Sequence, residues 1–397
     1  MLRHQKGTFS AFIIRLAIGA TALSVAVMIA SLAFIGGFKH TIREKLFSFW
    51  GEVLIVPFDA NSNDISSGLP VRWDAQLASQ VGGMKEVDHI YPFVVRPGII
   101  QSSGAMEGVR LKGFTRGQVF PSGISFSGGP IRFDDTGYAQ QVILSRTTAA
   151  RLNIKVGDEV KLYFVTTRAP RIRKLKVVGT YHTGMEEVDR QFALCDIRLL
   201  QHLSGWASDE ISGYQVELKD NRLADTMATQ IYDQYVMPPM SVQSIPEVYE
   251  GIFSWLGTQD TNGRILLFIV GIVAMINLAS AMMILMVDRA VMIGLLKTLG
   301  MAPGGLRAMF LSISGLIGGA GILLGNIIGI GICQAQAHWG FIKLPEETYN
   351  MSTVPVRIIW WHIALLDVGT LLLCLACAAL PLLYIRRVQP ARVLQFE

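Results

Sequence analysis

"MILMVDRAVMIGLLKTLGM", the stretch from Met283 to Met301, joins two apolar patterns of different kinds. Its first part completes an apolar run that begins at Ile265, and a run of this length can cross a bilayer as a helix. Asp288 and Arg289 end the run, and the apolar pattern that follows is too short and too interrupted to cross again. The stretch therefore predicts a membrane span that leads directly into a short helix outside the hydrocarbon.

The whole chain has the composition of a membrane protein. Charged residues make up 16% of its 397 residues, against roughly a quarter in soluble domains. Three further apolar runs, Leu16–Phe38, Ala308–Ile342 and Ile358–Ile385, reach the roughly 20 residues that a membrane helix needs. We predict four transmembrane helices. The first is a retained signal anchor, because its run exceeds the roughly 7–15 residues of a signal-peptide core.

Basic residues in the short loops predict the orientation, because Lys and Arg are enriched on the cytoplasmic side. The loop 288–307 and the tail 386–397 each carry three of them, which places both termini in the cytoplasm and largely accounts for the net charge of +5. No nucleic-acid partner is predicted. The segments are the N-terminus 1–8, first span 9–38, outer domain 39–263, second span 264–287, cytoplasmic loop 288–307, third span 308–337, outer loop 338–357, fourth span 358–385 and tail 386–397.

The outer segment has the pattern of a large α+β domain, of one body or of two small lobes. Two short helices are predicted at "SRTTAARLN" and "DIRLLQHL". Short β-rich runs are separated by Gly, Pro and Ser turns, namely "GEVLIVPF", "FVVRPGII", "GVRLKGF", "QVILS", "VKLYFV", "RKLKVVGTY" and "YQVELKD".

An amphipathic stripe flanks this domain on each side, in "FKHTIREKLFSFW" and "SIPEVYEGIFSWLG". The second stripe begins with a capping box formed by Ser244 and Glu247. Two interpretations stay open for these segments. They are either interfacial helices anchored by Trp50 and Trp255, or stalk helices that carry motion between the membrane and the outer domain.

The motifs of common enzymes do not occur in the sequence. It contains no P-loop, no H-E-x-x-H and no G-x-S-x-G. The seven histidines are scattered, and "HTGMEEVD" (182–189) is interpreted as a solvated loop rather than a metal site. We therefore predict a non-catalytic chain that binds no metal and no cofactor.

Polar and small residues inside the predicted spans indicate packing. Small residues four apart let helices approach closely, within one subunit or across a dimer, and this spacing occurs at Gly315, Gly319, Gly321, Gly325 and Gly329. Two further features are interpreted in the same way, namely Asp367 as a carboxyl hydrogen-bonded to Asn277 or Asn326, and Cys374 with Cys377 as small packing residues.

Beyond the second span, "DRAVMIGLLKTLG" has the spacing of a short amphipathic helix. Met292, Leu295, Leu296 and Leu299 form its apolar stripe, and Pro303 follows its end. Such a helix either lies in the headgroup layer or docks onto a soluble partner.

The order of one span, a large outer domain and three spans resembles the FtsX-like permease superfamily of ABC transporters, and most its lipoprotein-releasing (LolC/LolE-type) branch. The blocks "GFKHTIREKLFSFWGEVLI", "LSRTTAARLNIKVGDEV", "LKVVGTYHTGMEEVD", "DRAVMIGLLKTLGM" and "KLPEETYNMSTVPV" carry the resemblance over nearly the whole chain. It implies a type VII ABC (MacB-like) architecture in the inner membrane, with the outer domain in the periplasm.

The resemblance also implies the partners of the chain. Two copies of a separate LolD-like P-loop ATPase would hold the ATP and Mg, and a second permease subunit, identical or paralogous, would complete the membrane core. Lipoproteins in the membrane lipid would be the substrates, and a LolA-like periplasmic carrier would receive them. Nothing would be hydrolysed by this chain itself.

Three sets of site residues follow from the same resemblance. The coupling helix that contacts the ATPase would comprise Asp288, Arg289, Met292, Ile293, Gly294, Leu295, Leu296, Lys297, Leu299 and Gly300. The substrate cavity would be lined by Met28, Leu32, Ile35, Phe38, Leu266, Ile269 and Val273. A short hairpin around Arg168, Pro170 and Arg171 stands where LolC-type subunits carry a longer carrier-recruiting hook, which leaves a LolE-like or homodimeric role open.

Two alternative functions belong to the same superfamily. One is a MacB-like efflux or export permease, although that type carries its ATPase on the same polypeptide and this sequence has no P-loop. The other is an FtsX-like regulator that relays ATPase motion to a periplasmic cell-wall hydrolase, although its outer domain is usually much smaller.

Overall fold

The computed structural model describes residues 3–58, 69–102, 104–118, 123–135, 137–164, 171–344, 351 and 353–385. Its contacts divide the chain into two compact units. A helical unit comprises the described parts of Met1–His40, Leu256–Lys343 and Thr353–Glu397, and an α+β unit comprises Thr41–Trp255 with Leu344–Ser352. The insertion of one large α+β unit between the first and second spans confirms the predicted fold class.

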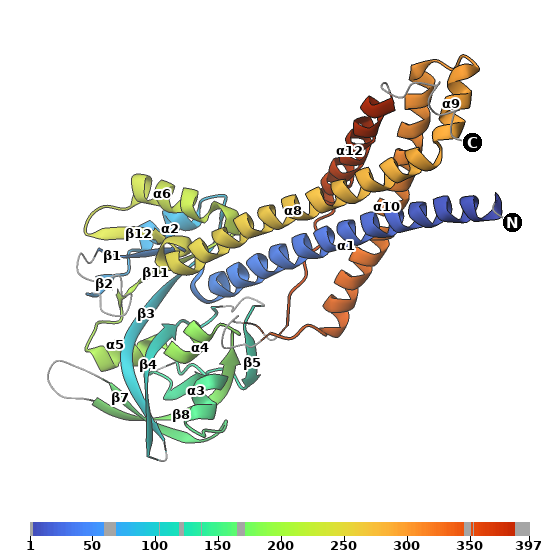
Figure 1. Cartoon of the computed structure of the whole chain (residues 1–397). Coiled ribbons are helices and arrows are strands. Elements are labelled where there is room, and N and C mark those ends of the chain that lie inside the picture. Colours follow the sequence, from blue (N-terminus) through green and yellow to red (C-terminus); the bar gives the residue numbers. More distant parts are fainter. Residues whose placement is uncertain are drawn as a thin grey trace. The chain divides into compact units, whose positions relative to one another are not determined.

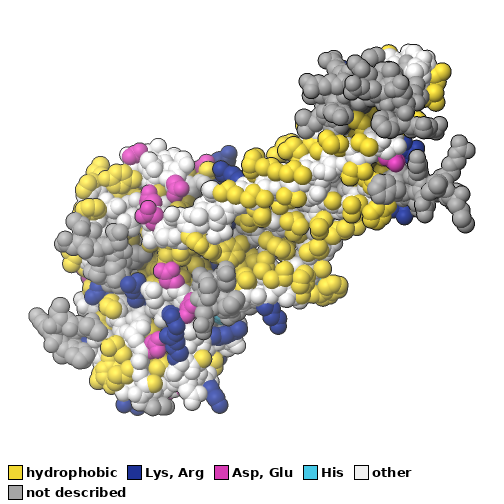
Figure 2. Space-filling view, in the orientation of Figure 1, with side chains coloured by type: hydrophobic (Ala, Val, Ile, Leu, Met, Phe, Trp, Pro, Cys, Tyr) yellow, Lys and Arg dark blue, Asp and Glu magenta, His cyan; other side chains and the backbone are white. Residues whose placement is uncertain are grey.

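The helical unit is built from four long helices (Figure 1), namely α1 (Arg3–Trp50), α8 (Glu250–Asp288), α10 (Pro303–Trp339) and α12 (Trp360–Ile385). By length and composition, four helices of the described chain can cross a membrane. Figure 2 shows hydrophobic side chains covering these helices, whereas most charged side chains in view lie on the α+β unit. The four predicted spans are therefore confirmed.

The first two spans continue beyond the hydrocarbon without a break. The 48 residues of α1 extend over about 72 Å, more than twice the roughly 30 Å that a bilayer core needs. The amphipathic segment expected after residue 38 is the last part of α1, whereas the one expected before residue 264 is divided between α7 (Ile245–Val248) and the start of α8. An interfacial helix has to turn where it leaves the span, and neither helix does, so the continuity favours the stalk interpretation.

Gly36 and Gly37 stay within α1 although glycine costs about 1 kcal/mol in a helix interior. A Cβ on Gly37 would lie 2.4 Å from the carbonyl oxygen of Pro355. The backbone N–H of Arg357 donates to the carbonyl oxygen of Ala33 over 3.0 Å. The absence of side chains at these glycines therefore lets the segment that leads into α12 pack directly against the backbone of α1.

Glycines of α10 bring it close to α1. A Cβ on Gly325 would lie 2.6 Å from the Cβ of Val25, and Cβ atoms on Gly321 and Gly329 would meet α1 in the same way. Gly319 has nothing within 4 Å of its Cβ position. Three of the five predicted glycines therefore pack helices within one subunit, which answers the question that their spacing alone left open.

The α+β unit is organised around β3 (Val87–Ser102), whose two halves pair with different strands. Its first half continues a sheet of β11 (Gly213–Leu218), β1 (Val53–Pro57) and β12 (Met240–Ser244). Its second half closes a ring with five strands, β4 (Ala105–Phe114), β9 (Phe192–Asp196), β6 (Gln141–Ser145), β8 (Arg171–His182) and β7 (Glu159–Phe164). Both predicted alternatives thus apply in part, because two lobes share one strand and one core cluster.

Shorter elements complete this unit. Strand β5 (Ser125–Gly128) extends the ring at β8, and β2 (Val71–Arg72) pairs with β10 (Glu210–Ile211). The helices are α2 (Ala75–Gly82), α3 (Arg146–Arg151), α4 (Glu186–Gln191), α5 (Ile197–Ser204), α6 (Ala224–Tyr235) and α7 (Ile245–Val248), with a 3₁₀ turn at Asn221–Leu223. The capping box of Ser244 and Glu247 is confirmed at α7.

The interpretation of residues 182–189 as a solvated loop is wrong. Asp189 is 1% exposed and accepts hydrogen bonds from the N–H and hydroxyl of Thr183 and from the N–H of Gly184. His182 Nδ1 lies 2.9 Å from the same carboxylate. The carboxylate of Asp189 therefore binds the backbone of the turn between β8 and α4 from inside the domain, and the three acidic residues of this stretch concealed that burial.

Candidate functional site

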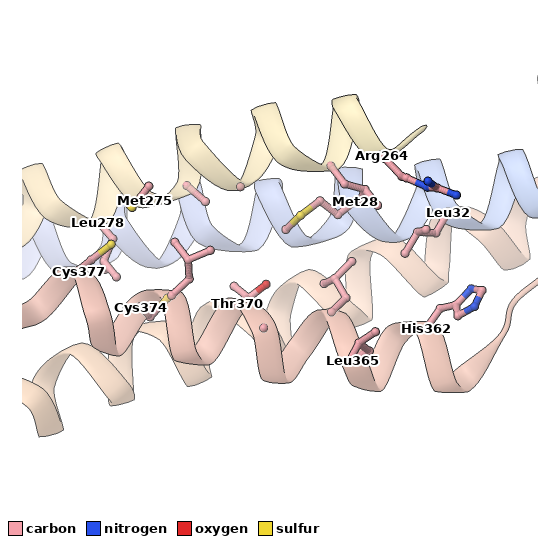
Figure 3. A pocket seen from close by; sticks show the side chains of 16 residues that line it. Met28, Leu32, Arg264, Met275, Leu278, His362, Leu365, Thr370, Cys374 and Cys377 are labelled. Atoms are coloured by element: carbon pink, nitrogen blue, oxygen red, sulfur yellow. The ribbon is translucent and has the colours of Figure 1, made fainter. Parts of the chain in front are cut away.

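A pocket of about 560 Å³ lies between α1, α8 and α12. Figure 3 shows it elongated along the helices, with Arg264 and His362 at one end and Leu278 and Cys377 at the other. Most of its sixteen lining side chains are apolar, which is typical of pockets that bind lipids or other apolar ligands. This pocket is therefore a candidate binding site for an apolar ligand.

Two of the predicted cavity residues line this pocket, namely Met28 and Leu32 of α1. Ile35 and Phe38 are partly buried and do not line it. Ile35 packs instead against α8, since a Cβ on Gly263 would lie 2.8 Å from its Cδ1.

The three predicted residues of the second span lie on another face of α8. Leu266, Ile269 and Val273 are 40%, 51% and 48% exposed and do not line the pocket. Leu267, Gly271, Ala274, Met275 and Leu278 of α8 do. Each residue turns a helix by about 100°, so a shift of one position changes the face. A span that is apolar all round carries no signal that fixes this phase.

Polar and sulfur-containing side chains of the spans hold the bundle together. Asn326 Nδ2 donates to Asp367 Oδ2 over 2.8 Å, which confirms the predicted hydrogen bond between neighbouring helices. Cys374 and Cys377 are 5% and 1% exposed, and the sulfur of Cys374 would lie 3.0 Å from a Cβ on Gly318. These cysteines pack α12 against α10 and also line the inner part of the pocket.

Helix α9 (Ala290–Thr298) is the predicted coupling helix. Asp288 and Arg289 form the junction with α8, with Arg289 Nε 3.9 Å from Asp288 Oδ2. Gly300 has φ +85° and ends the helix, and the N–H of Met301 donates to the carbonyl oxygen of Leu296 as in a Schellman motif. A glycine is required there because this backbone conformation disfavours other residues.

One side of α9 packs on the bundle and the other is exposed and apolar. Ile293 and Gly294 are buried, and Leu296 packs partly against the same core cluster. Met292, Leu295 and Leu299 are 38%, 55% and 75% exposed. The predicted stripe is therefore largely free on the described chain, while the side chain of Lys297 lies outside the described residues.

The predicted hairpin exists in the α+β unit, because β7 pairs with β8 from Phe164 and Arg171 onward. Arg168 and Pro170 lie in the connection 165–170, outside the described residues. Arg171 donates through Nη1 to the carbonyl oxygens of His202 and Leu203, over 3.1 and 2.9 Å. Its guanidinium thus binds the C-terminal end of α5, a contact that the sequence did not indicate.

A buried lysine fixes the outer end of α1, which sequence reasoning missed. Lys112 of β4 is 2% exposed and donates to the carbonyl oxygen of Phe49 and, over 2.9 Å, to Gln215 Oε1. Its ammonium lies 4.5 and 4.3 Å from the ring centroids of Phe49 and Trp50. Burial lowers the pKa of Lys112 from 10.5 to about 7, opposed by the charge of Glu217. Its hydrogen bond to Phe49 satisfies one of the last carbonyl groups of α1, which have no partner within the helix.

Trp50 links this end of α1 to the segment that leads into α8. It is fully buried, and its indole N–H donates to the hydroxyl of Tyr249 over 2.7 Å. Trp50 is therefore no belt anchor at a membrane surface, and that part of the interfacial interpretation is wrong. We call Phe49, Trp50, Lys112, Gln215 and Tyr249 the α1 joint.

Comparisons with known proteins match both parts of the chain. Residues 16–233 match the MacB-like periplasmic core domain and residues 264–390 the FtsX-like permease C-terminal region. Two relatives are lipoprotein-releasing system transmembrane proteins LolC, one from Xylella fastidiosa (strain Temecula1) and one from Neisseria meningitidis serogroup B. They are 23% and 24% identical to this chain, each over 99% of it and 96% of the relative. The periplasmic region of MacB from Actinobacillus actinomycetemcomitans aligns with a TM-score of 0.36 and 12% identity, over 51% of this chain and 92% of that one.

Proposed function

Because the chain belongs to the FtsX-like ABC transporter permeases with a MacB-like periplasmic core domain, we propose that it extracts lipoproteins from the outer leaflet of the inner membrane. It would release them towards a periplasmic carrier for sorting to the outer membrane. The observation that carries this proposal is the similarity to lipoprotein-releasing permeases over nearly the full length of both chains.

The energetics require a coupled ATPase. Each CH₂ withdrawn from a bilayer costs about 0.8 kcal/mol. The free energy of extracting several acyl chains is therefore larger than a protein without an energy source can supply. No P-loop occurs in this sequence. ATP and Mg would therefore be held by a separate P-loop ATPase, in two copies, and this chain would be a non-catalytic subunit without a cofactor of its own.

Helix α9 is the surface on which that ATPase would act. Its exposed residues Met292, Leu295 and Leu299 form an apolar face beside a bundle-packed face at Ile293. A helix with one fixed and one free apolar face can bind a groove on a partner and transmit its movement to the spans. We assign this side of the membrane, with both chain termini, to the cytoplasm.

The substrate cavity would form between two permease subunits, identical or paralogous. Leu266, Ile269 and Val273 of α8, which are exposed on the single chain, would meet the partner subunit or the acyl chains there. Met28 and Leu32 of α1 line the pocket within the subunit. The hairpin of β7 and β8 would be the place where a carrier docks.

Co-purification distinguishes this function from its relatives. The tagged full chain, solubilised with its ATPase, should retain lipoproteins, and the soluble carrier should bind the complex. Recovery of a cell-wall hydrolase or a coiled-coil activator in place of lipoproteins would contradict lipoprotein release and favour the FtsX-like regulatory function.

A further inference from the structure

The pocket between α1, α8 and α12 has the length of one lipid chain. Its lining on α8 runs from Arg264 to Leu278, which corresponds to about 21 Å along a helix. One leaflet contributes about half of the roughly 30 Å hydrocarbon core. An acyl chain that enters at the Arg264 end and follows the helices therefore fits within the pocket.

The Arg264 end of the pocket is positively charged and lies at an aromatic belt. Arg264 and His362 are the polar side chains at this end (Figure 3), and no Asp or Glu lines the pocket. Among the described residues, Arg264 has no ion-pair or hydrogen-bond partner. Trp360 and Trp361, which precede His362, are 65% and 73% exposed, as residues at headgroup level commonly are.

We propose that this pocket binds one glycerophospholipid from the surrounding leaflet, with an acyl chain along the apolar lining and its phosphate at Arg264 and His362. Arginine binds phosphate through charge-assisted hydrogen bonds. The site lies within a single subunit and does not depend on the cargo proposed above. The acyl anchor of a lipoprotein carries no phosphate, which is why the charge at this end favours the phospholipid.

Two glycines allow the pocket to be filled without disturbing the bundle. Cβ atoms on Gly271 and Gly369, which both line the pocket, would meet nothing within 4 Å. Gly271→Leu therefore places a side chain where the acyl chain would lie. Gly331→Leu is the matched control, because Gly331 on α10 is exposed, equally unobstructed and outside the pocket.

Native mass spectrometry of the full chain, delipidated in detergent and titrated with phosphatidylglycerol, measures occupancy directly. Gly271→Leu should lower the affinity at least tenfold, and Gly331→Leu should leave it unchanged. Equal binding by wild type and Gly271→Leu would overturn the proposal. So would an equal loss in both glycine variants, because the effect would then not belong to the pocket.

The charge is tested with a second pair of variants and a second lipid. Arg264→Gln should weaken phosphatidylglycerol binding about tenfold by removing a charge-assisted hydrogen bond. It should leave the binding of diacylglycerol with the same acyl chains unchanged. Arg357→Gln, an exposed arginine outside the pocket, should change neither. If diacylglycerol or a triacylated lipopeptide binds as tightly as phosphatidylglycerol, and Arg264→Gln affects all alike, the pocket holds an acyl anchor without a phosphate and the proposal fails.

Discussion

Two ionisable side chains, Lys112 in the α1 joint and Glu52 next to it, are held away from water. Lys112 donates to the last turn of α1, and Glu52, one residue beyond Gly51, accepts a hydrogen bond from the N–H of Leu218 over 2.7 Å. Burial raises the pKa of Glu52 from 4.5 to about 7, opposed by that hydrogen bond. Both groups therefore change protonation near neutral pH, at the point where a span enters the α+β unit.

Glu52→Gln should flatten the pH dependence of unfolding between pH 4.5 and 7. In this window the folded chain retains a proton on Glu52 that the unfolded chain releases. The stability that this proton contributes is fully present below pH 4.5 and is lost as the pH rises through about 7. The free energy of unfolding falls by up to about 3 kcal/mol over this range. Thermal unfolding of the full chain in detergent at several pH values measures the slope.

Lys112 contributes in the opposite sense above this window. Its lowered pKa means that the unfolded chain binds more protons between pH 7 and 10.5, so stability rises there. Wild type should therefore show a stability minimum near pH 7, and Glu52→Gln should lose much of the fall on its acid side. An unchanged acid-side slope in the variant would show that Glu52 is ionised in the folded chain.

Gly325 tests the packing of α10 on α1. Gly325→Ile places a Cβ 2.6 Å from the Cβ of Val25 and 2.8 Å from the carbonyl oxygen of Ala22, and overpacking of this kind costs about 1–3 kcal/mol or more. The melting temperature of the full chain in detergent should fall. Gly331→Ile, on the same helix with nothing within 4 Å of its Cβ position, should not lower it, and equal losses would contradict this packing.

Among the elements, α9 carries the proposed coupling to the ATPase. Leu299→Asp replaces an exposed apolar side chain with a charge, and Leu299→Met keeps the apolar surface. Since a central apolar contact contributes about 2 kcal/mol or more to a helix–groove interface, the aspartate should weaken ATPase binding at least tenfold while the methionine binds normally. Binding of purified ATPase to the permease in nanodiscs measures this. Equal affinities would place the contact elsewhere.

Hydropathy predicted the spans and α9, because twenty apolar residues and a stripe of four are local signals. The face of α8 that lines the pocket was not predictable, since packing on α1 and α12 decides it. Strand β9, "FALCD" (192–196), was also missed. All five of its residues are buried and it pairs in parallel with β4, so it shows no alternation of polar and apolar residues. The burial of Lys112 was missed because the local sequence around it indicates an exposed, polar face of a strand. The end of α1, which is distant in the sequence, covers that face.

At the scale of the whole molecule, the proposed permease would convert the action of an ATPase at α9 into removal of lipid-anchored proteins from a membrane. Its two units share α1, which extends from Arg3 to Trp50 without interruption. A continuous helix with a fixed end at the α1 joint is suited to carry movement along its axis. The proposed function therefore predicts an activity of the assembled transporter as a whole.

The most direct test is ATP-dependent release of a lipoprotein from proteoliposomes that contain this chain, its ATPase and a soluble carrier outside. The account predicts that lipoprotein moves from the vesicles to the carrier when ATP is added, and that Leu299→Asp abolishes the transfer while Leu299→Met supports it. Lipoprotein that stays in the vesicles with wild-type chain, or that leaves equally with Leu299→Asp, would contradict it.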